Sequence, residues 1–260
     1  MYLEREKDFI ICQMKTAFQR FAASGPRDIR QKSQFDLVTE VDVAVEQYLT
    51  DAISREFPED RIHAEEMASH ETISGRTWTI DPIDGTCNMA RNIPLYGVQV
   101  SLFQEGQPAL GAIYLPFWEQ MLWAVRGEGC WCNEERIYVN RSTSLNNAVI
   151  SFGDYTHKSD AMALRQHKAV GYVYPRVAKL RMYGAACVDM ALVAQGKLDA
   201  TALTTTNVWD LAPGIALCRE AGAIVTNLDG QPWKVGDAGV IVGATEQSSE
   251  LMCRGFGLKG

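Results

Sequence analysis

The stretch TWTIDPIDGT, residues 77–86, constrains the fold of this chain more than any other segment. Its first four residues are β-branched or aromatic, which suits a half-buried strand, and Pro82 and Gly85 indicate a turn that ends the strand. Asp81 and Asp84 are therefore predicted to lie at a strand end. Because two carboxylates held this close repel each other unless a cation lies between them, the arrangement favours a metal site over a salt bridge.

Length and charge exclude several classes of protein. The chain has 260 residues, of which 47% are hydrophobic, enough for one large domain or two compact halves with a substantial core. It carries 25 basic and 32 acidic residues, a formal charge of -7, and no run of Lys or Arg that could contact a phosphate backbone. We therefore expect no nucleic acid polymer as a partner.

The sequence also argues against membranes and disulfides. No apolar run approaches the roughly 20 residues of a membrane span, and the N-terminus lacks the pattern of a signal peptide, so we expect no membrane partner and a cytoplasmic location. Seven scattered cysteines are typical of reduced, mostly buried thiols. Cys130 and Cys132 form the only close pair, and their single-residue spacing does not match a zinc site.

Hydrophobic periodicity predicts an α/β (α+β) fold in two halves. Residues 1–145 form an N-terminal α+β half, with amphipathic helices over 3–23 and from Thr39 to about 57, separated by a polar loop that contains Lys32. Short β-rich runs then predict an antiparallel meander over 98–103, 109–115, 120–125 and 136–139. Residues 146–260 alternate strand and helix and form a C-terminal α/β half. Its strands are expected at 149–152, 180–182, 223–226 and 240–244, and its helices at 159–167, 188–194, 209–222 and 247–252.

Carboxylates recur where predicted elements begin or end. Hard oxygen ligands suit Mg²⁺, which prefers octahedral geometry and keeps several waters, and the carbonyl of Ile83 could complete such a shell. Two such ions can activate a water and stabilise the leaving oxygen of a phosphate ester. Asp42 also lies three residues after Thr39, so a capping box explains it as well as a functional role does. The carboxylates are Asp42, Glu65, Glu66, Asp81, Asp84 and Asp210.

The sequence contains few residues that would support other catalytic mechanisms. The histidines His63, His70, His157 and His167 are dispersed, and neither H-E-x-x-H nor G-x-S-x-G occurs. A Ser-His-Asp hydrolase is therefore not predicted. The chain also lacks a Walker-type sequence and a complete dinucleotide fingerprint, which argues against a nucleotide cofactor.

Three segments in order resemble the signatures of the inositol monophosphatase family, whose members are magnesium-dependent, lithium-sensitive phosphatases. They are Glu65-Glu66, the DPIDGT segment at 81–86 and Trp209-Asp210, and the resemblance extends over nearly the whole chain. It implies a layered α/β/α/β/α sandwich with the site at the seam between the halves. Family members are commonly homodimers.

The resemblance also implies a role for each matching residue. Glu65, Asp81 and the Ile83 carbonyl would bind one Mg²⁺. Asp81, Asp84 and Asp210 would bind a second ion, and Glu65 would bind a weaker third. Glu65 and Thr86 would position the attacking water, with Asp42 supporting Thr86. The substrate would contact Asp84, Gly85, Thr86, Gly184, Ala185 and Asp210, and Lys32, Glu66 and Arg91 are further candidates near the site.

The catalytic motifs do not identify the substrate. Members of the family hydrolyse inositol phosphates, fructose 1,6-bisphosphate, histidinol phosphate or 3′-phosphorylated nucleotides. Leu203 stands where members that favour inositol phosphates often carry an acidic residue, which weakens an inositol assignment. A catalytically idle relative that serves as a binding or regulatory protein is the non-enzyme alternative, and the retention of every catalytic residue argues against it.

Overall fold

The computed structural model describes residues 3–26, 28–33, 36–67, 73–142, 144–155 and 159–257. The chain begins with helix α1 (Glu4–Ala17), which continues as a π-helical turn (Phe18–Ala22) and is followed by the two-stranded antiparallel sheet of β1 (Ile29–Ser33) and β2 (Asp36–Thr39). The predicted polar loop around Lys32 was therefore wrong, because these residues pair with β2 as strand β1.

Helix α2 (Glu40–Glu56) starts at the predicted capping box. The Thr39 hydroxyl and backbone N–H contact Asp42, and the Val41 N–H donates to the Thr39 hydroxyl. This arrangement satisfies backbone donors that have no partner within the helix.

A seven-stranded sheet forms the centre of the N-terminal part, with strands in sequence order. β3 and β4 run parallel, and each later pair is antiparallel. The predicted meander is confirmed, but the sequence analysis missed β8 because its four residues follow a glycine-rich turn. The strands are β3 (Arg61–Ala64), β4 (Thr77–Asp84), β5 (Gly97–Gln104), β6 (Gln107–Leu115), β7 (Gln120–Val125), β8 (Gly129–Cys132) and β9 (Glu135–Ile137).

Strand β4 does not stop where the sequence predicted. It continues through the two aspartates to Asp84, with a shift in register against β5 between Asp81 and Asp84. Pro82 lies inside this irregularity, where a missing backbone N–H costs no regular ladder bond. The expected turn at Pro82 is therefore a bulge in a longer strand.

The C-terminal part contains a five-stranded sheet in the order β11-β10-β12-β14-β13, with the first three strands parallel and β14 antiparallel to both neighbours. Helix α6 begins at Val208, one residue before the expected start, and Pro213 lies inside it. The strands are β10 (Val149–Phe152), β11 (Lys179–Arg181), β12 (Ala200–Leu203), β13 (Ile224–Thr226) and β14 (Val240–Gly243), and the helices are α4 (Asp160–Val173), α5 (Ala186–Ala194), α6 (Val208–Glu220) and α7 (Glu246–Phe256).

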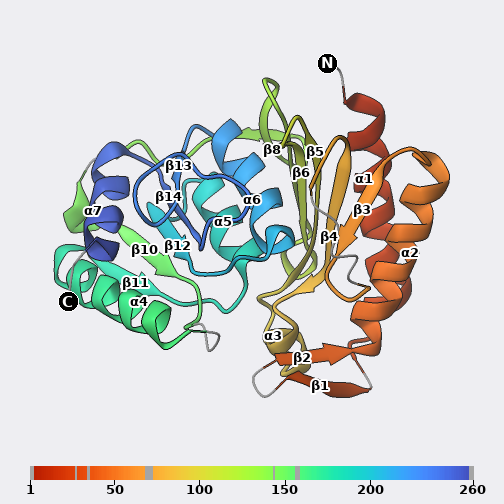
Figure 1. The fold of residues 1–260 in the computed structure, drawn as a ribbon, viewed down its shortest axis with the longest axis horizontal. Coiled ribbons are helices and arrows are strands. Elements are labelled where there is room, and N and C mark those ends of the chain that lie inside the picture. The colour runs from red at the N-terminus through yellow and green to blue at the C-terminus, as the bar shows by residue number, and fades with distance from the viewer. Residues whose placement is uncertain are drawn as a thin grey trace.

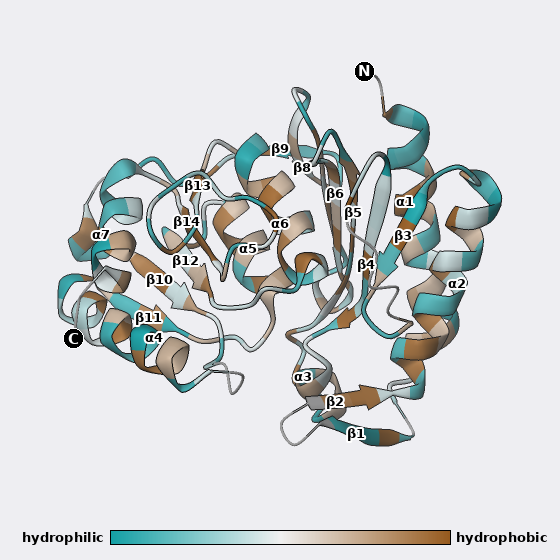
Figure 2. Cartoon of the chain, in the orientation of Figure 1, coloured by the Kyte–Doolittle hydropathy of each residue, from teal (hydrophilic) through white to brown (hydrophobic). Residues whose placement is uncertain are grey.

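The elements stack in five layers, as predicted (Figure 1). Helices α1 and α2 cover one face of the seven-stranded sheet, α5 and α6 lie between the two sheets, and α4 and α7 cover the outer face of the second sheet. Figure 2 shows mostly apolar residues along α5 and α6 and more polar residues on the outer helices. A helix that is apolar on all sides is one that is buried on all sides.

The middle helices join the two sheets into one core. Side chains of β5, β6 and β7 belong to the same apolar cluster as those of α5, α6 and β14. The division at residues 145/146 stays a prediction. Within the described ranges, no helix is long and apolar enough to cross a membrane.

Candidate active site

The ends of β3 and β4 bring Glu65 beside Asp81. The two strands are parallel, with Ala64 opposite Ile80, and the Glu65 N–H donates to the Ile80 carbonyl at 3.2 Å. The residues that follow the two strands therefore lie at the same edge of the sheet. This places the two acidic segments predicted from the sequence next to each other.

Asp81 is held from the neighbouring strand. Its side chain is 1% exposed, and the Nε2 of Gln99 on β5 donates to its Oδ2 at 3.0 Å. The same amide contacts the backbone carbonyl of Asp210 at 3.4 Å. Gln99 thus connects β4 to the first turn of α6, which packs on β4, β5 and β6.

Asp84 and Asp210 are each turned towards a donor of the C-terminal part. The backbone N–H of Cys187, in the first turn of α5, donates to Asp84 Oδ2 at 2.5 Å. The Thr205 hydroxyl donates to Asp210 Oδ2 at 2.9 Å. Both carboxylates line the same cavity, so the structure brings together the acidic residues of the three predicted segments.

Thr86 lies at the start of the short helix α3 (Thr86–Ala90). Its hydroxyl is 3.0 Å from Asp42 Oδ1 and 2.9 Å from the Ile83 carbonyl oxygen. Because a hydroxyl has one proton, it donates to one of these acceptors at a time. Asp42 is therefore both the N3 residue of the capping box of α2 and a partner of Thr86, so the capping interpretation is confirmed and the functional role stays a prediction.

Gly85 makes the sharp connection between β4 and α3. Its φ of 88° lies in the left-handed region, and a Cβ there would come within 2.9 Å of the Leu95 carbonyl oxygen and 3.0 Å of Ala185 Cβ. Only glycine allows the backbone to approach this closely. Ala185 is the N-cap residue of α5 and Gly184 precedes it, so these predicted substrate contacts lie next to the end of β4 and line the same cavity as Asp84.

Burial and mutual repulsion raise the pKa values of the carboxylates at this site. Burial raises the pKa of Asp81 well above its usual value, and the charges of Glu65, Asp84 and Asp210 raise it further. Burial also raises the pKa of Asp84, although hydrogen bonds from Cys187 and Ala186 oppose the shift. Burial raises the pKa of Asp42 against its bonds to Thr39 and Thr86. A group of buried, mutually repelling carboxylates is the environment that a cation stabilises.

The donor set fits Mg²⁺. Asp81 Oδ1 is buried and accepts no hydrogen bond from the described residues, so one oxygen at the centre of the group is available as a ligand. Within the described parts of the chain, no three or more Asp, Glu, His or Cys side chains are already arranged to hold a metal ion, and Asp84 and Asp210 are bonded to protein donors. Mg²⁺ needs few protein ligands, since waters and substrate phosphate complete its shell.

Lys32 and Glu66 lie beside this group, whereas Arg91 points elsewhere. The Nζ of Lys32 is 2.8 Å from Glu66 Oε1 and 3.4 Å from Glu65 Oε1. Arg91 is exposed, and its Nη1 contacts Cys87 Sγ at 2.9 Å. Arg91 is not among the residues that line the cavity, and its role in substrate binding stays a prediction.

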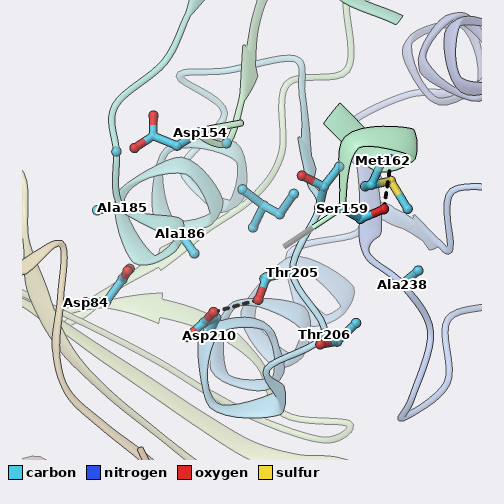
Figure 3. Close-up of a pocket in the computed structure, with 14 residues that line it drawn as sticks. Asp84, Asp154, Ser159, Met162, Ala185, Ala186, Thr205, Thr206, Asp210 and Ala238 are labelled. Carbon is cyan, nitrogen blue, oxygen red and sulfur yellow. Dashed lines mark hydrogen bonds between the residues drawn. The ribbon is translucent and has the colours of Figure 1, made fainter. Parts of the chain in front are cut away.

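A cavity of about 480 Å³ adjoins the carboxylates, between the two parts of the chain. Figure 3 shows Asp84 and Asp210 on one side of it and Met162 and Ala238 on the other. The remaining wall contains hydroxyl groups and one further carboxylate. The lining residues are Asp84, Gly153, Asp154, Ser159, Met162, Gly184, Ala185, Ala186, Leu203, Thr204, Thr205, Thr206, Asp210 and Ala238.

The sequence analysis missed two residues that hold the site, Gln99 and Glu46. Gln99 is fully buried on β5 between Val98 and Val100, and an amide flanked by apolar residues in a strand is a detectable signal of a buried polar contact. Glu46 lies four residues after Asp42, on the apolar face of α2. A second acidic residue on that face was visible in the sequence.

Comparison with known proteins identifies the family. The family model described as the inositol monophosphatase family matches residues 10–257. A fructose-1,6-bisphosphatase/inositol-1-monophosphatase of Aquifex aeolicus is 32% identical over 238 residues, covering 91% of this chain and 89% of that protein. A histidinol-phosphatase of Mycobacterium tuberculosis is 33% identical over 213 residues, covering 79% and 80%.

Solved structures agree in fold over the whole chain. The IMPase of Thermotoga maritima superposes with a TM-score of 0.86 at 27% identity, covering 97% of this chain and 96% of that chain. A staphylococcal inositol monophosphatase-1, described as a LiCl-soaked inhibitory complex, superposes with a TM-score of 0.85 at 26% identity, covering 100% and 97%. On the sequence match and the shared fold, the chain belongs to the inositol monophosphatase family.

Proposed function

We propose that this chain is a Mg²⁺-dependent phosphatase that hydrolyses the phosphate monoester of a small alcohol by attack of water on phosphorus. The observation that carries the proposal is the Asp81 carboxylate, whose pKa is raised by burial and by the charges of Glu65, Asp84 and Asp210 and whose Oδ1 has no donor among the described residues. Asp84 and Asp210 also line a cavity large enough for a sugar or polyol phosphate.

The acidic residues divide into overlapping ligand sets. Glu65, Asp81 and the Ile83 carbonyl would hold one Mg²⁺. Asp81, Asp84 and Asp210 would hold a second ion, and Glu65 would hold a third, weaker ion. When bound, these ions would supply positive charge that acidifies water and offsets the negative charge of the phosphate and the departing oxygen.

The other groups of the site orient the water and the ester. When Thr86 donates its proton to Asp42, 3.0 Å away, its oxygen is available to accept a hydrogen bond from the attacking water. The Glu65 carboxylate would accept the second hydrogen of that water, and the N–H groups of Gly85 and Thr86 would contact phosphate oxygens. A bond then forms from the water oxygen to phosphorus, the ester P–O bond breaks, and the alcohol leaves with a proton.

The far wall of the cavity indicates the kind of alcohol. Leu203, Met162 and Ala238 offer apolar contact, and Ser159 and the threonines at 204–206 offer hydroxyls. Asp154 is the further carboxylate among the lining residues, so the hydroxyls of a bound alcohol would be held mainly by neutral hydroxyl groups. We propose a sugar, polyol or amino-alcohol phosphate, with histidinol phosphate and fructose 1,6-bisphosphate as the first candidates because relatives carry those activities in their names.

Phosphate release tests the proposal. Purified protein is incubated with inositol 1-phosphate, fructose 1,6-bisphosphate, histidinol phosphate and a 3′-phosphonucleotide, each in Mg²⁺ and in EDTA. We expect release from at least one ester in Mg²⁺ and none in EDTA. Folded protein that releases no phosphate from any ester in Mg²⁺, or that releases it equally in EDTA, would contradict the proposal.

Two further properties follow from family membership and stay predictions. We propose inhibition by Li⁺, which the description of the staphylococcal structure supports for that protein, and assembly as a homodimer. The same assay with LiCl tests the first, and sedimentation velocity tests the second.

A further inference from the structure

The buried face of α2 carries two carboxylates. Asp42 is 1% exposed and Glu46 is 0% exposed, whereas their neighbours Val45, Leu49 and Ile53 are apolar and belong to the core. A carboxylate taken out of water is costly unless hydrogen bonds satisfy its oxygens. Asp42 has such partners in Thr39 and Thr86, so the partners of Glu46 are informative.

Glu46 binds the turn that follows Glu65. Its Oε2 accepts the backbone N–H of Glu66 at 2.8 Å, and its Oε1 accepts the N–H of Met67 at 2.6 Å. The N–H of Glu65 is already bonded to Ile80 on β4 at 3.2 Å. The backbone around Glu65 is therefore fixed on one side by the sheet and on the other by α2.

Neighbouring groups act on the charge of Glu46 in both directions. Burial raises its pKa, and the charge of Glu66 raises it further. The two backbone N–H bonds oppose that rise, as does Lys32, which contacts Glu65 and Glu66. Hydrogen bonds to a carboxylate are stronger than those between neutral groups, so the anchor is strongest when Glu46 is ionised.

Helical spacing connects this anchor to Thr86. Side chains four residues apart lie on the same face of a helix, about one turn from each other. Asp42 contacts the Thr86 hydroxyl, and Glu46 contacts the turn after Glu65. We infer that Glu46 is a positioning residue, which together with Asp42 makes α2 the element that fixes Glu65 relative to Thr86. The inference rests on the proposed function, in which these two residues orient the attacking water.

A role in stability alone predicts a different result. If Glu46 only filled a position in the core, its replacement would lower the melting temperature without altering Mg²⁺ binding or turnover of the folded enzyme. Leu49→Ala provides the matched control, because Leu49 is equally buried on the next turn of the same face and belongs to the apolar core.

Amide hydrogen exchange tests the anchor without any assay of activity. In the wild-type protein the amides of Glu66 and Met67 should be protected, and in Glu46→Gln both should exchange at least about tenfold faster while those of β4 and α2 do not change. In Leu49→Ala these two amides should stay protected relative to the rest of the chain. Exchange in the wild type as fast as in an exposed turn would overturn the inference, even if no variant folds.

Kinetics then tests the positioning role. For Glu46→Gln we expect the half-saturating Mg²⁺ concentration to rise or kcat to fall by about 10–100-fold, as found for residues that orient metal ligands. The KM for the ester should change less than about twofold, because the cavity wall lies on other elements. Glu46→Asp, which keeps the charge on a shorter side chain, should recover part of the loss.

The outcomes separate this inference from the proposed function. Loss of amide protection together with normal Mg²⁺ response and normal kcat would overturn the positioning role. A wild-type protein that releases no phosphate would instead contradict the proposed function, and calorimetric Mg²⁺ titration of wild type and Glu46→Gln would still decide whether Glu46 supports the metal site.

Discussion

The two walls of the active-site cavity are built in different ways. The wall at the end of the seven-stranded sheet presents the half-buried Asp84, which accepts the N–H of Cys187, and next to it Asp81 is buried and bonded to Gln99. On the opposite wall, Met162 and Ala238 present apolar groups from α4 and from the loop before β14. The residues of the first wall are suited to one type of reaction, whereas the residues of the second wall can differ according to the alcohol that is bound. This explains why the carboxylate motifs indicate a reaction but not an alcohol.

The largest effect is expected on the first wall, for Asp84→Asn. The neutral side chain keeps an oxygen that can accept the Cys187 N–H but loses the charge proposed for Mg²⁺ binding. We expect turnover to fall by at least about 10²–10³-fold, the range for loss of one preorganised electrostatic contact. Because burial raises the pKa of Asp84, removal of the charge should leave the melting temperature unchanged or higher. A variant with normal phosphate release would remove Asp84 from the metal site.

The rigidity of that wall is tested at Gly85. Gly85→Ala combines left-handed strain with a Cβ 2.9 Å from the Leu95 carbonyl oxygen, so we expect the free energy of unfolding to fall by about 2–4 kcal/mol. Gly75→Ala is the control, since φ is 61° there and nothing lies within 4 Å, and it should cost about 1–2 kcal/mol. Urea denaturation measures both. Equal losses in the two variants would show that close packing around Gly85 is unimportant.

The response to pH distinguishes the carboxylate wall from the rest of the molecule. In the metal-free protein, the folded-state pKa values of Asp42, Asp81 and Asp84 are raised above 3.8. The stability that they contribute is therefore present below the unfolded-state pKa and is lost as pH rises through the folded-state values. Mg²⁺ requires the deprotonated groups.

The increase in melting temperature caused by Mg²⁺ should consequently grow as pH rises through the raised folded-state pKa values of these groups. Thermal melts in EDTA and in Mg²⁺ measure it, and at 100 times the Kd the stabilisation should be about 2.7 kcal/mol. An effect of Mg²⁺ that is as large at the acidic end as at the basic end would argue against carboxylate ligands with raised pKa values.

The smallest effect is expected on the second wall. Met162→Ala removes an apolar contact with the proposed alcohol, so KM should rise about 2–10-fold for the preferred ester, in line with the cost of losing part of an apolar side chain. The half-saturating Mg²⁺ concentration should stay within twofold, roughly the error of such assays. A change in Mg²⁺ dependence as large as the change in KM would show that the two walls are not independent.

The sequence predicts the elements of this fold better than their contacts. Strand and helix periodicity located β4, α2 and most others, because each pattern depends on local burial. It did not show that β3 runs parallel to β4, which is what places Glu65 beside Asp81. It also placed Lys32 in a loop, because a strand of polar residues such as β1 has no apolar alternation to detect.

The site was predictable only where motifs mark it. The three acidic segments gave the residues that the structure brings together, and the Thr39 capping box gave Asp42. Glu46 and Gln99 were missed because each acts through a tertiary hydrogen bond to another element. Met162 and Ala238 reach the cavity only through the packing of the C-terminal layers, which no local pattern encodes.

Calorimetric titration of Mg²⁺ into metal-free protein tests the central claim most directly, with wild type compared with Asp81→Asn. Asp81 is proposed to belong to both principal ligand sets, and its pKa is raised by burial and by its acidic neighbours. We predict that the wild type binds Mg²⁺ and that a folded Asp81→Asn variant binds it at least about 100-fold more weakly. A loss of this size is at or beyond the upper end of the range for residues that only orient metal ligands. Equal affinity in the two proteins would contradict the metal site at the end of β4.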